Sequence, residues 1–551
     1  MTASRRHHVV VVGAGVAGLA AAHYLTRPKA PGGAGARAGA ADVRVTVLEG
    51  SPRIGGKLLV SEVAGIQVDA GAEAMLARRP EGLGLVRDLG HADDLVHPGT
   101  TSASIWSYGA LRPLPGGHVM GVPADLPELA RSHILSGAGL TRAPLDLVLP
   151  ATPRGADVSV AAYVGARLGR EVVDRLVEPL LGGVYAGLAD ELSFDATMPA
   201  LAESARSHRS LIAAARTLRR TAPADAGPVF TTLDGGLGTL PELLAAAVRA
   251  RGGTIRTDAM VRGLHRRGAG QDAGGAAGAN GAGGADGAGG PGGSADAGGG
   301  WRLTVGPARA PEYIDADAVI LAVPARPAAR LLADEAPPAA RELDAIEYAS
   351  MAIVTLAYTA NAFTRPLRGS GYLVPAVEVG DTGVKAVTYS TVKWPHLTRE
   401  APGVVIVRCS IGRYGDEHVL QRSDGDLKAA AITEMARTSG ASELPIDSRV
   451  TRWGGGLPQY TVGHADRVAR IRSAVAGLPN LAVCGAAYDG LGVPACVATA
   501  RAAATRVLDG LIGRAESKYG YDDGEAEGTT PQQRDPIHDV VGLPGEEPRP
   551  D

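Results

Sequence analysis

The chain has 551 residues, of which 45% are hydrophobic and 21% charged, and its formal net charge at pH 7 is -3. This length exceeds that of one compact core, so two or three domains are expected. The near-neutral charge excludes a dedicated nucleic-acid-binding protein, whose domain would be strongly basic. The three cysteines, Cys409, Cys484 and Cys496, lack zinc-site spacing. They therefore indicate buried thiols in a reducing cytoplasm and no metal site.

Two features bear on membranes. The chain start, MTASRRHHVVVVGAG, lacks the long apolar stretch of a signal peptide,. No stretch approaches 18 consecutive apolar residues, the length that a spanning helix needs,. We therefore expect a cytoplasmic protein with at most a peripheral membrane contact, made through the helical region after Ala124.

The first predicted strand and helix carry the strongest motif, VVVVGAGVAGLAAAHYL. Gly13 permits a tight turn, Gly15 lets the backbone approach a pyrophosphate, and Gly18 lets the helix pack on the strand. The free amides of Val16 and Ala17 at the helix N-terminus face the phosphates. The context of strand, glycine turn and helix predicts a dinucleotide site.

The next predicted strand, Arg44 to Leu48, ends at Glu49, a hydrogen-bond acceptor for a ribose hydroxyl,. Glu49 lies 31 residues after Gly18, and a Gly/Ala-rich insert at residues 28–41 accounts for the long spacing. That insert lacks the apolar side chains needed to offset the entropy of ordering, so we expect it to be disordered. An acidic residue disfavours a 2′-phosphate and argues against NADP, which leaves FAD and NAD.

A second glycine turn follows in SPRIGGKL, with Arg53, Gly55, Gly56 and Lys57. Its amides and basic side chains form another anion-binding turn near the same pyrophosphate. The spacing from Glu49 to this turn resembles the flavoproteins that include monoamine oxidases, phytoene desaturases and protoporphyrinogen oxidases. In that group the turn accompanies FAD.

The middle of the chain mixes strands and helices. Residues 124–220 are mainly helical, with apolar residues at three- and four-residue spacing in Val158 to Leu168 and Glu171 to Leu181,. A helix is predicted at Leu237 to Arg251, and strands are predicted at the positions Ala259–His265, Trp301–Val305, Ala318–Ala322, Met351–Tyr358 and Val404–Cys409. This pattern predicts an α/β nucleotide-binding domain plus an α+β domain with a helical insert.

The C-terminal segment LAVCGAAYDGLGVPACVATARAAA contains a strand ending near Cys484 and a helix from about Val493. In the flavoprotein group just named, this segment completes the FAD site, which assigns Leu491, Gly492 and Val493 to it. Residues 268–300 are almost entirely Gly and Ala, and residues 513–551 are acidic and rich in Pro and Gly. We expect a second disordered insert and a disordered acidic tail there.

From about residue 8 to 510 the chain resembles the protoporphyrinogen and coproporphyrinogen oxidases, above all the Gram-positive-type enzymes. The segments that carry this resemblance include VDAGAEAMLARRPEGLGLVRDLG, RLVEPLLGGVYAGLADELSFDATMPAL, FTTLDGGLGTLPELL, STVKWPHL and WGGGLPQYTVGH. The resemblance implies non-covalent FAD, because the chain has no cysteine in a GGCY context. By family match, further FAD contacts are Gly71, Ala72, Glu73, Ala74, Met75, Val261 and Trp453, with Val261 ending a strand beside the first glycine turn.

The expected domains follow the same resemblance. The FAD-binding domain comprises residues 1–90, 228–335 and 450–512. The substrate-binding domain comprises residues 91–123 and 336–449, and the helical subdomain comprises residues 124–227.

The implied activity is oxidation of coproporphyrinogen III to coproporphyrin III in haem biosynthesis, with O2 as acceptor, H2O2 as product and hand-off to a ferrochelatase. Protoporphyrinogen IX oxidation is the alternative. Eukaryotic relatives carry an arginine at the position of Glu73, so the substrate carboxylates need other partners. The candidates are Arg78 and Arg79, with Tyr389 and Lys393 in a segment that the family places near the substrate cavity. No catalytic acid or base is assigned, since hydride transfer is the chemistry of the cofactor.

Two rival functions remain. A flavin amine oxidase carries a lysine near the flavin. The matching position here is Ile353, which argues against that function. A non-enzymatic flavin scaffold does not need the substrate-domain segments that this chain retains.

Overall fold

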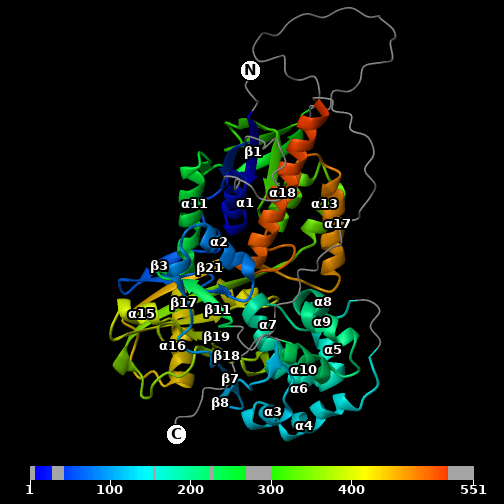
Figure 1. The fold of residues 1–551 in the computed structure, drawn as a ribbon. Helices are drawn as coiled ribbons and strands as arrows, with labels where there is room; N and C mark the ends of the chain where they lie inside the picture. Colours follow the sequence, from blue (N-terminus) through cyan, green and yellow to red (C-terminus); the bar gives the residue numbers. More distant parts are fainter. Residues whose placement is uncertain (1–5, 28–42, 153–156, 222–226, 268–299, 519–551) are drawn as a thin grey trace, which may run out of the picture.

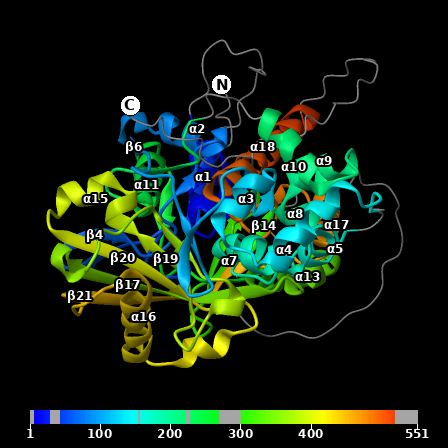
Figure 2. The same ribbon diagram turned by 90° about the horizontal axis from the view of Figure 1, so that it is seen from below.

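The computed structural model describes residues 6–27, 43–152, 157–221, 227–267 and 300–518. Two large sheets, of five and seven strands, and a helical region make up most of the described chain (Figure 1). Seen from below, the helical region lies beside the larger sheet (Figure 2). The predicted insert at 28–41, nearly all of that at 268–300 and most of the acidic tail lie outside the described residues. Among the described helices, none is long and apolar enough to cross a membrane.

The five-stranded sheet is parallel and has the order β12-β2-β1-β16-β22. Its strands are Thr254–Arg256, Val43–Leu48, His7–Val12, Ala318–Leu321 and Leu481–Val483. The central strand β1 reads HHVVVV because both of its faces are covered, as parallel sheets require,. Val9 and Val11 face one layer of helices, and Val10 and Val12 face the other layer.

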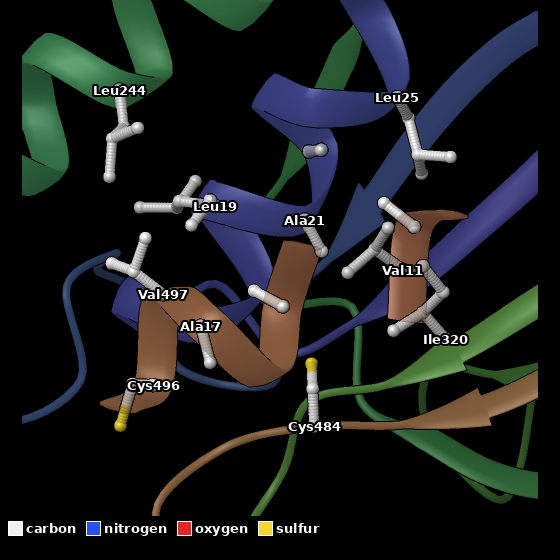
Figure 3. Packing of buried hydrophobic residues seen from close by; sticks show 14 of the residues in the cluster. Val11, Ala17, Leu19, Ala21, Leu25, Leu244, Ile320, Cys484, Cys496 and Val497 are labelled. Carbon is white, nitrogen blue, oxygen red and sulfur yellow. The ribbon is translucent and has the colours of Figure 1, made fainter. Parts of the chain in front are cut away.

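The first layer consists of α1 (Val16–Thr26), α11 (Leu240–Ala250) and α18 (Val493–Lys518). The alanines of α1 are buried, and their small side chains let α18 pack closely against it,. Figure 3 shows Ala17 and Ala21 of α1 between Val497 of α18 and Val11 of β1. The first and last described helices are therefore direct neighbours.

The second layer is formed by an antiparallel three-stranded sheet and three helices. These elements are β13 (Val261–Arg266), β14 (Trp301–Val305), β15 (Glu312–Ala316), α12 (Ala325–Leu332), α13 (Pro337–Asp344) and α17 (His464–Ala476).

The seven-stranded sheet has the order β21-β17-β20-β19-β18-β7-β8. Its strands are Asp447–Pro458, Tyr348–Thr359, Val404–Ile411, Val384–Tyr389, Gly371–Leu373, Ser104–Ser107 and Ala110–Pro113. Helix α16 (Asp424–Ser439) covers one face. The other face meets the hairpin of β3 (Val60–Val63) and β4 (Ile66–Asp69), and α15 (Pro395–Glu400).

The helical region has its own core. Its helices are α3 (Leu126–Ser132), α4 (Gly137–Arg142), α5 (Val160–Leu168), α6 (Arg170–Val172), a π turn at Val173–Val177, α7 (Glu178–Tyr185), α8 (Phe194–Thr197), α9 (Pro199–Arg206) and α10 (Leu211–Thr221). Short elements complete the described chain: β5 (Met75–Leu76), α2 (Pro80–Asp88), β6 (Leu95–Val96), β9 (His118–Val119), β10 (Val122–Pro123), β11 (Phe230–Leu233) and α14 (Ser390–Lys393).

Three predicted boundaries differ from the structure. Val261 begins β13 and does not end a strand, because the turn that precedes it is hydrogen-bonded to the end of β2. Strand β21 pairs with β17 along most of its length, so the predicted domain boundary at residue 450 falls within one strand. Helix α18 continues to Lys518 and therefore crosses the predicted start of the acidic tail at residue 513.

Candidate active site

The first glycine turn lies between β1 and α1. A Cβ atom on Gly13, whose φ is +102°, would lie 2.6 Å from the Ala322 carbonyl oxygen, and one on Gly18 would lie 1.9 Å from the Gly13 oxygen. Both glycines are required by the fold itself. Gly15 differs, because its φ of -71° suits any residue and a Cβ there would meet no atom within 4 Å. The open side of the turn is therefore at Gly15, beside the free amides at the start of α1.

The Glu49 carboxylate lies against this turn. One oxygen accepts a hydrogen bond of 2.8 Å from the Ala14 amide and the other accepts one of 2.9 Å from the Ser51 amide. A carboxylate has about four acceptor positions, so two remain for ribose hydroxyls. The Glu49 carbonyl accepts a hydrogen bond of 2.8 Å from the Ala259 amide, which brings the start of β13 at Val261 to the same edge of the sheet.

The second glycine turn packs directly on the first. Gly15 and Gly55 form a parallel bridge, and a Cβ on Gly56 would lie 3.2 Å from the Gly15 Cα atom. Arg53 donates a hydrogen bond of 2.8 Å to the Gly56 carbonyl, which holds its guanidinium at this turn. Burial lowers the pKa of Lys57, and Arg53 lowers it further. Two basic groups therefore adjoin the open side at Gly15.

The segment after β4 continues the site. The Ala72 amide donates to the Lys57 carbonyl over 3.2 Å, and a Cβ on Gly71 would lie 1.9 Å from that same oxygen. Trp453 Nε1 donates a hydrogen bond of 2.9 Å to the Ala70 carbonyl, so β21 holds this segment from the other side. The Met75 side chain is buried in the core, so it presents only its backbone to a ligand.

Glu73 forms ion pairs with two basic residues. Arg408 lies in β20 of the seven-stranded sheet, and Lys393 lies in α14, in the connection between β19 and β20. The Glu73 carboxylate lies 2.7 Å from Lys393 Nζ and also pairs with the Arg408 guanidinium. Burial alone would raise the pKa of Glu73, but the charges of Lys393 and Arg408 lower it to about 2. Sequence reasoning missed Arg408, although an arginine within the apolar run VVIVRCSI was a usable signal,.

A small buried cavity adjoins this ion cluster. Its lining residues include Asp69, Thr232, Ser390, Trp394, His396 and Arg408. Within the described chain, five of their polar atoms have no hydrogen-bond partner: Thr232 Oγ1, Ser390 Oγ, Trp394 Nε1, His396 Nδ1 and Arg408 Nε. Burial raises the pKa of Asp69 to about 6, against the hydrogen bonds that it accepts from the Gly238 and Leu237 amides. Such a polar pocket suits ordered water.

The other predicted substrate residues are not brought together. Arg79 pairs with Glu81 in the first turn of α2, and Arg78 donates to the Gly227 carbonyl over 3.2 Å. The Tyr389 side chain is 2% exposed and packs in the core beneath α16. Its hydroxyl is 2.8 Å from Ser439 Oγ, so Tyr389 lies on the wrong face of the sheet to meet Lys393 and Glu73.

The C-terminal part of the site lies at the start of α18. Val493 is the first residue of this helix, and it follows Leu491 and Gly492 in a glycine-rich turn. Leu491 packs against the core of the helical region. The helix N-terminus therefore opens at the junction of the parallel sheet and the helical region, where its dipole favours negative charge.

The sequence model of the flavin-containing amine oxidoreductases matches residues 16–508 of this chain. The chain belongs to this family. Family membership establishes a flavin enzyme with the mixed α/β fold described above, which confirms the fold class predicted from the sequence.

Comparison with individual relatives shows which members of the family the chain resembles. The chain is 35% identical over 504 residues to the coproporphyrinogen III oxidase of Mycobacterium tuberculosis, covering 91% of this chain and 97% of the relative. It is 29% identical over 516 residues to the coproporphyrinogen III oxidase of Bacillus subtilis, covering 92% and 99% of the two chains. A solved structure from Exiguobacterium sp. 255-15 superimposes with a TM-score of 0.73 at 29% identity, covering 92% and 99%. The predicted family resemblance is thereby confirmed.

Proposed function

We propose that this member of the flavin-containing amine oxidoreductases is an oxygen-dependent coproporphyrinogen III oxidase that binds FAD non-covalently. The observation that carries the proposal is the contact of the two glycine turns at Gly15 and Gly55, with Glu49 beside them. The activity follows from the likeness to coproporphyrinogen III oxidases along nearly the whole chain.

The residues present fit an FAD molecule. A pyrophosphate fits the open side of Gly15, where the amides of Val16 and Ala17 have no acceptor within the helix,. Lys57 and Arg53 supply positive charge, and Glu49 accepts from the adenosine ribose. The backbone at Val261 would hold the adenine, and the start of α18 at Leu491, Gly492 and Val493 would hold the flavin end.

The overall reaction removes six electrons and six protons from coproporphyrinogen III in three steps. Three O2 molecules accept them, which gives coproporphyrin III and three H2O2. FAD, when bound, supplies the two-electron chemistry of each step. The chain holds the porphyrinogen against the cofactor and excludes water. No residue is assigned as an acid or base.

The test has two parts. Acid precipitation of the purified yellow protein should release FAD into the supernatant, and flavin retained in the pellet would contradict non-covalent binding. Porphyrin fluorescence should then give a higher kcat/KM for coproporphyrinogen III than for protoporphyrinogen IX. The opposite preference would overturn the substrate assignment, and activity on neither would overturn the function.

We further place the enzyme in the cytoplasm, with a peripheral membrane contact through the helical region and transfer of its product to a ferrochelatase. High salt or carbonate should release the protein from membranes. Retention after a carbonate wash would contradict the peripheral contact.

A further inference from the structure

Lys385 is a buried lysine in the seven-stranded sheet. It lies in β19, and the residue is only 3% exposed. Its Nζ atom is buried and has no hydrogen-bond partner among the described residues. An uncompensated ammonium in a protein interior is strongly unfavourable, so a lysine at this position needs an explanation.

A second buried cation, Arg413, lies near Lys385, because both residues bond to Val374, whose amide donates a hydrogen bond of 2.8 Å to the Lys385 carbonyl. Arg413, which follows β20, is 7% exposed, and its charge lowers the pKa of Lys385, which burial already lowers, to about 7. Arg413 donates one hydrogen bond, of 2.7 Å, to the Val374 carbonyl. Its other N–H groups make no hydrogen bond within the described chain, so this guanidinium retains the two parallel donors that a carboxylate accepts.

These cations lie between the sheet and α7. Tyr372 and Val387 form a cross-strand pair beneath α16, and the next pair, Leu373 and Ala386, faces the opposite side of the sheet. The register of β19 shifts at Lys385, between Val384 and Ala386, so regular alternation does not return Lys385 to the α16 face. On that opposite side, α7 covers β18 and β19 (Figure 1). A Cβ on Gly182 of α7 would lie 3.2 Å from Arg413 Nη1. The cation pair therefore belongs to the junction of the substrate sheet with the helical region.

Two acidic residues, Glu178 and Asp416, lie near Arg413. Glu178 at the start of α7 is 4% exposed, and burial lowers the pKa of Arg413 while the charges of Glu178 and Asp416 counteract that shift. Burial raises the pKa of Glu178, and the charge of Arg413 counteracts that shift. The acidic groups of the junction thus face Arg413, whereas the Lys385 Nζ atom has no hydrogen-bond partner among the described residues.

The neighbouring surface suits an apolar ring system. On α7, Gly183 and Val184 are exposed, Val184 to 46%. A Cβ on Gly183 would lie 3.5 Å from Leu373 Cδ2. An exposed apolar strip of α7 thus lies next to the buried cations, the combination that an amphiphilic ligand with carboxylate arms requires.

We propose that Lys385 and Arg413 bind one propionate carboxylate of the porphyrinogen at this junction. The proposal rests on the proposed function and assigns two substrate residues beyond Arg78, Arg79 and Lys393. The bound carboxylate neutralises the buried positive charge. Its hydrogen bonds to the Arg413 guanidinium and the Lys385 ammonium offset the free-energy cost of removing it from water.

The test measures binding of the product to the FAD-loaded protein. Coproporphyrin III and its uncharged tetramethyl ester are titrated by porphyrin fluorescence. Lys385→Met should weaken binding of the acid by about 10- to 100-fold, the usual worth of a charged hydrogen bond, and should leave ester binding unchanged. Lys428→Met, which removes a lysine from α16 on the other face, is the matched control and should change neither constant.

Each outcome has a distinct meaning. If the wild-type protein neither binds coproporphyrin III nor oxidises coproporphyrinogen III, the proposed function fails. If the wild type does both and folded Lys385→Met retains the same ratio of acid to ester affinity, the cation site is refuted. Lys385→Met should fold, because it removes a buried charge and no hydrogen bond,. Arg413→Gln tests the second cation with the same two ligands and should give the same selective loss.

Discussion

The Gly55 amide donates a hydrogen bond of 2.8 Å to the Ala14 carbonyl. This bond locks the second glycine turn onto the first and leaves Gly15 at the open side of both. The three glycines of the first motif consequently have different tasks, although the motif itself does not distinguish them.

Gly15→Val should therefore give a folded protein without flavin. A Cβ atom at Gly15 would meet no protein atom within 4 Å, but the valine side chain would occupy the space where the pyrophosphate binds. The visible flavin spectrum should disappear, and the circular dichroism spectrum should stay that of the wild type. Gly18→Val is the contrasting variant and should lose soluble protein, because its Cβ would overlap the Gly13 carbonyl. Full flavin occupancy in Gly15→Val would refute the assignment.

Glu73→Gln should destabilise the protein by about 3 to 5 kcal/mol, because it leaves Lys393 and Arg408 without their shared carboxylate,. Urea unfolding at neutral pH measures this difference. Glu62→Gln, an exposed residue of β3, is the control and should fall within about 0.5 kcal/mol of the wild type.

The cost of Glu73→Gln should also depend on pH. The folded pKa of Glu73, about 2, lies below its ordinary value of 4.5. Ionised Glu73 therefore stabilises the fold fully above pH 4.5, and this stabilisation declines as the pH falls from 4.5 to 2. Wild type and variant should converge in stability over that interval. A constant difference down to pH 2 would show that the carboxylate is not held ionised.

Arg167→Met should destabilise the helical region by about 3 to 5 kcal/mol. Arg167 and Asp146 form an ion pair of 2.5 Å with side chains 2% and 0% exposed. Removal of the arginine leaves a buried carboxylate whose charge is uncompensated. Arg170→Met, three residues along, removes the ion pairs of an exposed arginine with Asp174 and Asp190 and should cost at most about 1 kcal/mol. Equal costs in denaturant unfolding would contradict this contrast.

The three thiols should be inert in the native protein. Cys409, Cys484 and Cys496 are buried and free, and burial raises the pKa of each, that of Cys496 to about 12. A thiol-reactive chromophore should label none of them in buffer and all three in denaturant. Rapid labelling of the folded protein would reveal an accessible thiolate.

Local patterns were enough to predict much of the fold. Strand β14 was predicted with its observed bounds, because alternating apolar residues flanked by polar segments define a short strand on their own,. The glycine turns and Glu49 were also recognised from sequence, since turn, acceptor and helix lie within one supersecondary unit. The family and the fold class were confirmed.

Contacts between distant segments could not be predicted in the same way. Glu73 meets Lys393 and Arg408 across 320 and 335 residues, and only the folded chain brings the segment after β4, helix α14 and strand β20 together. Tyr389 shows the same limit. Alternation along a strand shows that its side chain and that of its neighbour point to opposite faces of the sheet, but not which face α16 covers. Lys385 was missed in the same way as Arg408: a lone basic residue in an apolar strand signals a buried cation, but it does not identify the partner,.

The packing of α1 against α18 has a consequence for biosynthesis. Synthesis proceeds from the N-terminal side of a chain, so β1, α1 and the first glycine turn are made before β22 and α18. Strand β22 and helix α18, at residues 481–518, belong to the same layer. The nascent polypeptide consequently cannot assemble both sides of its nucleotide cleft before residues 481–518 have been made.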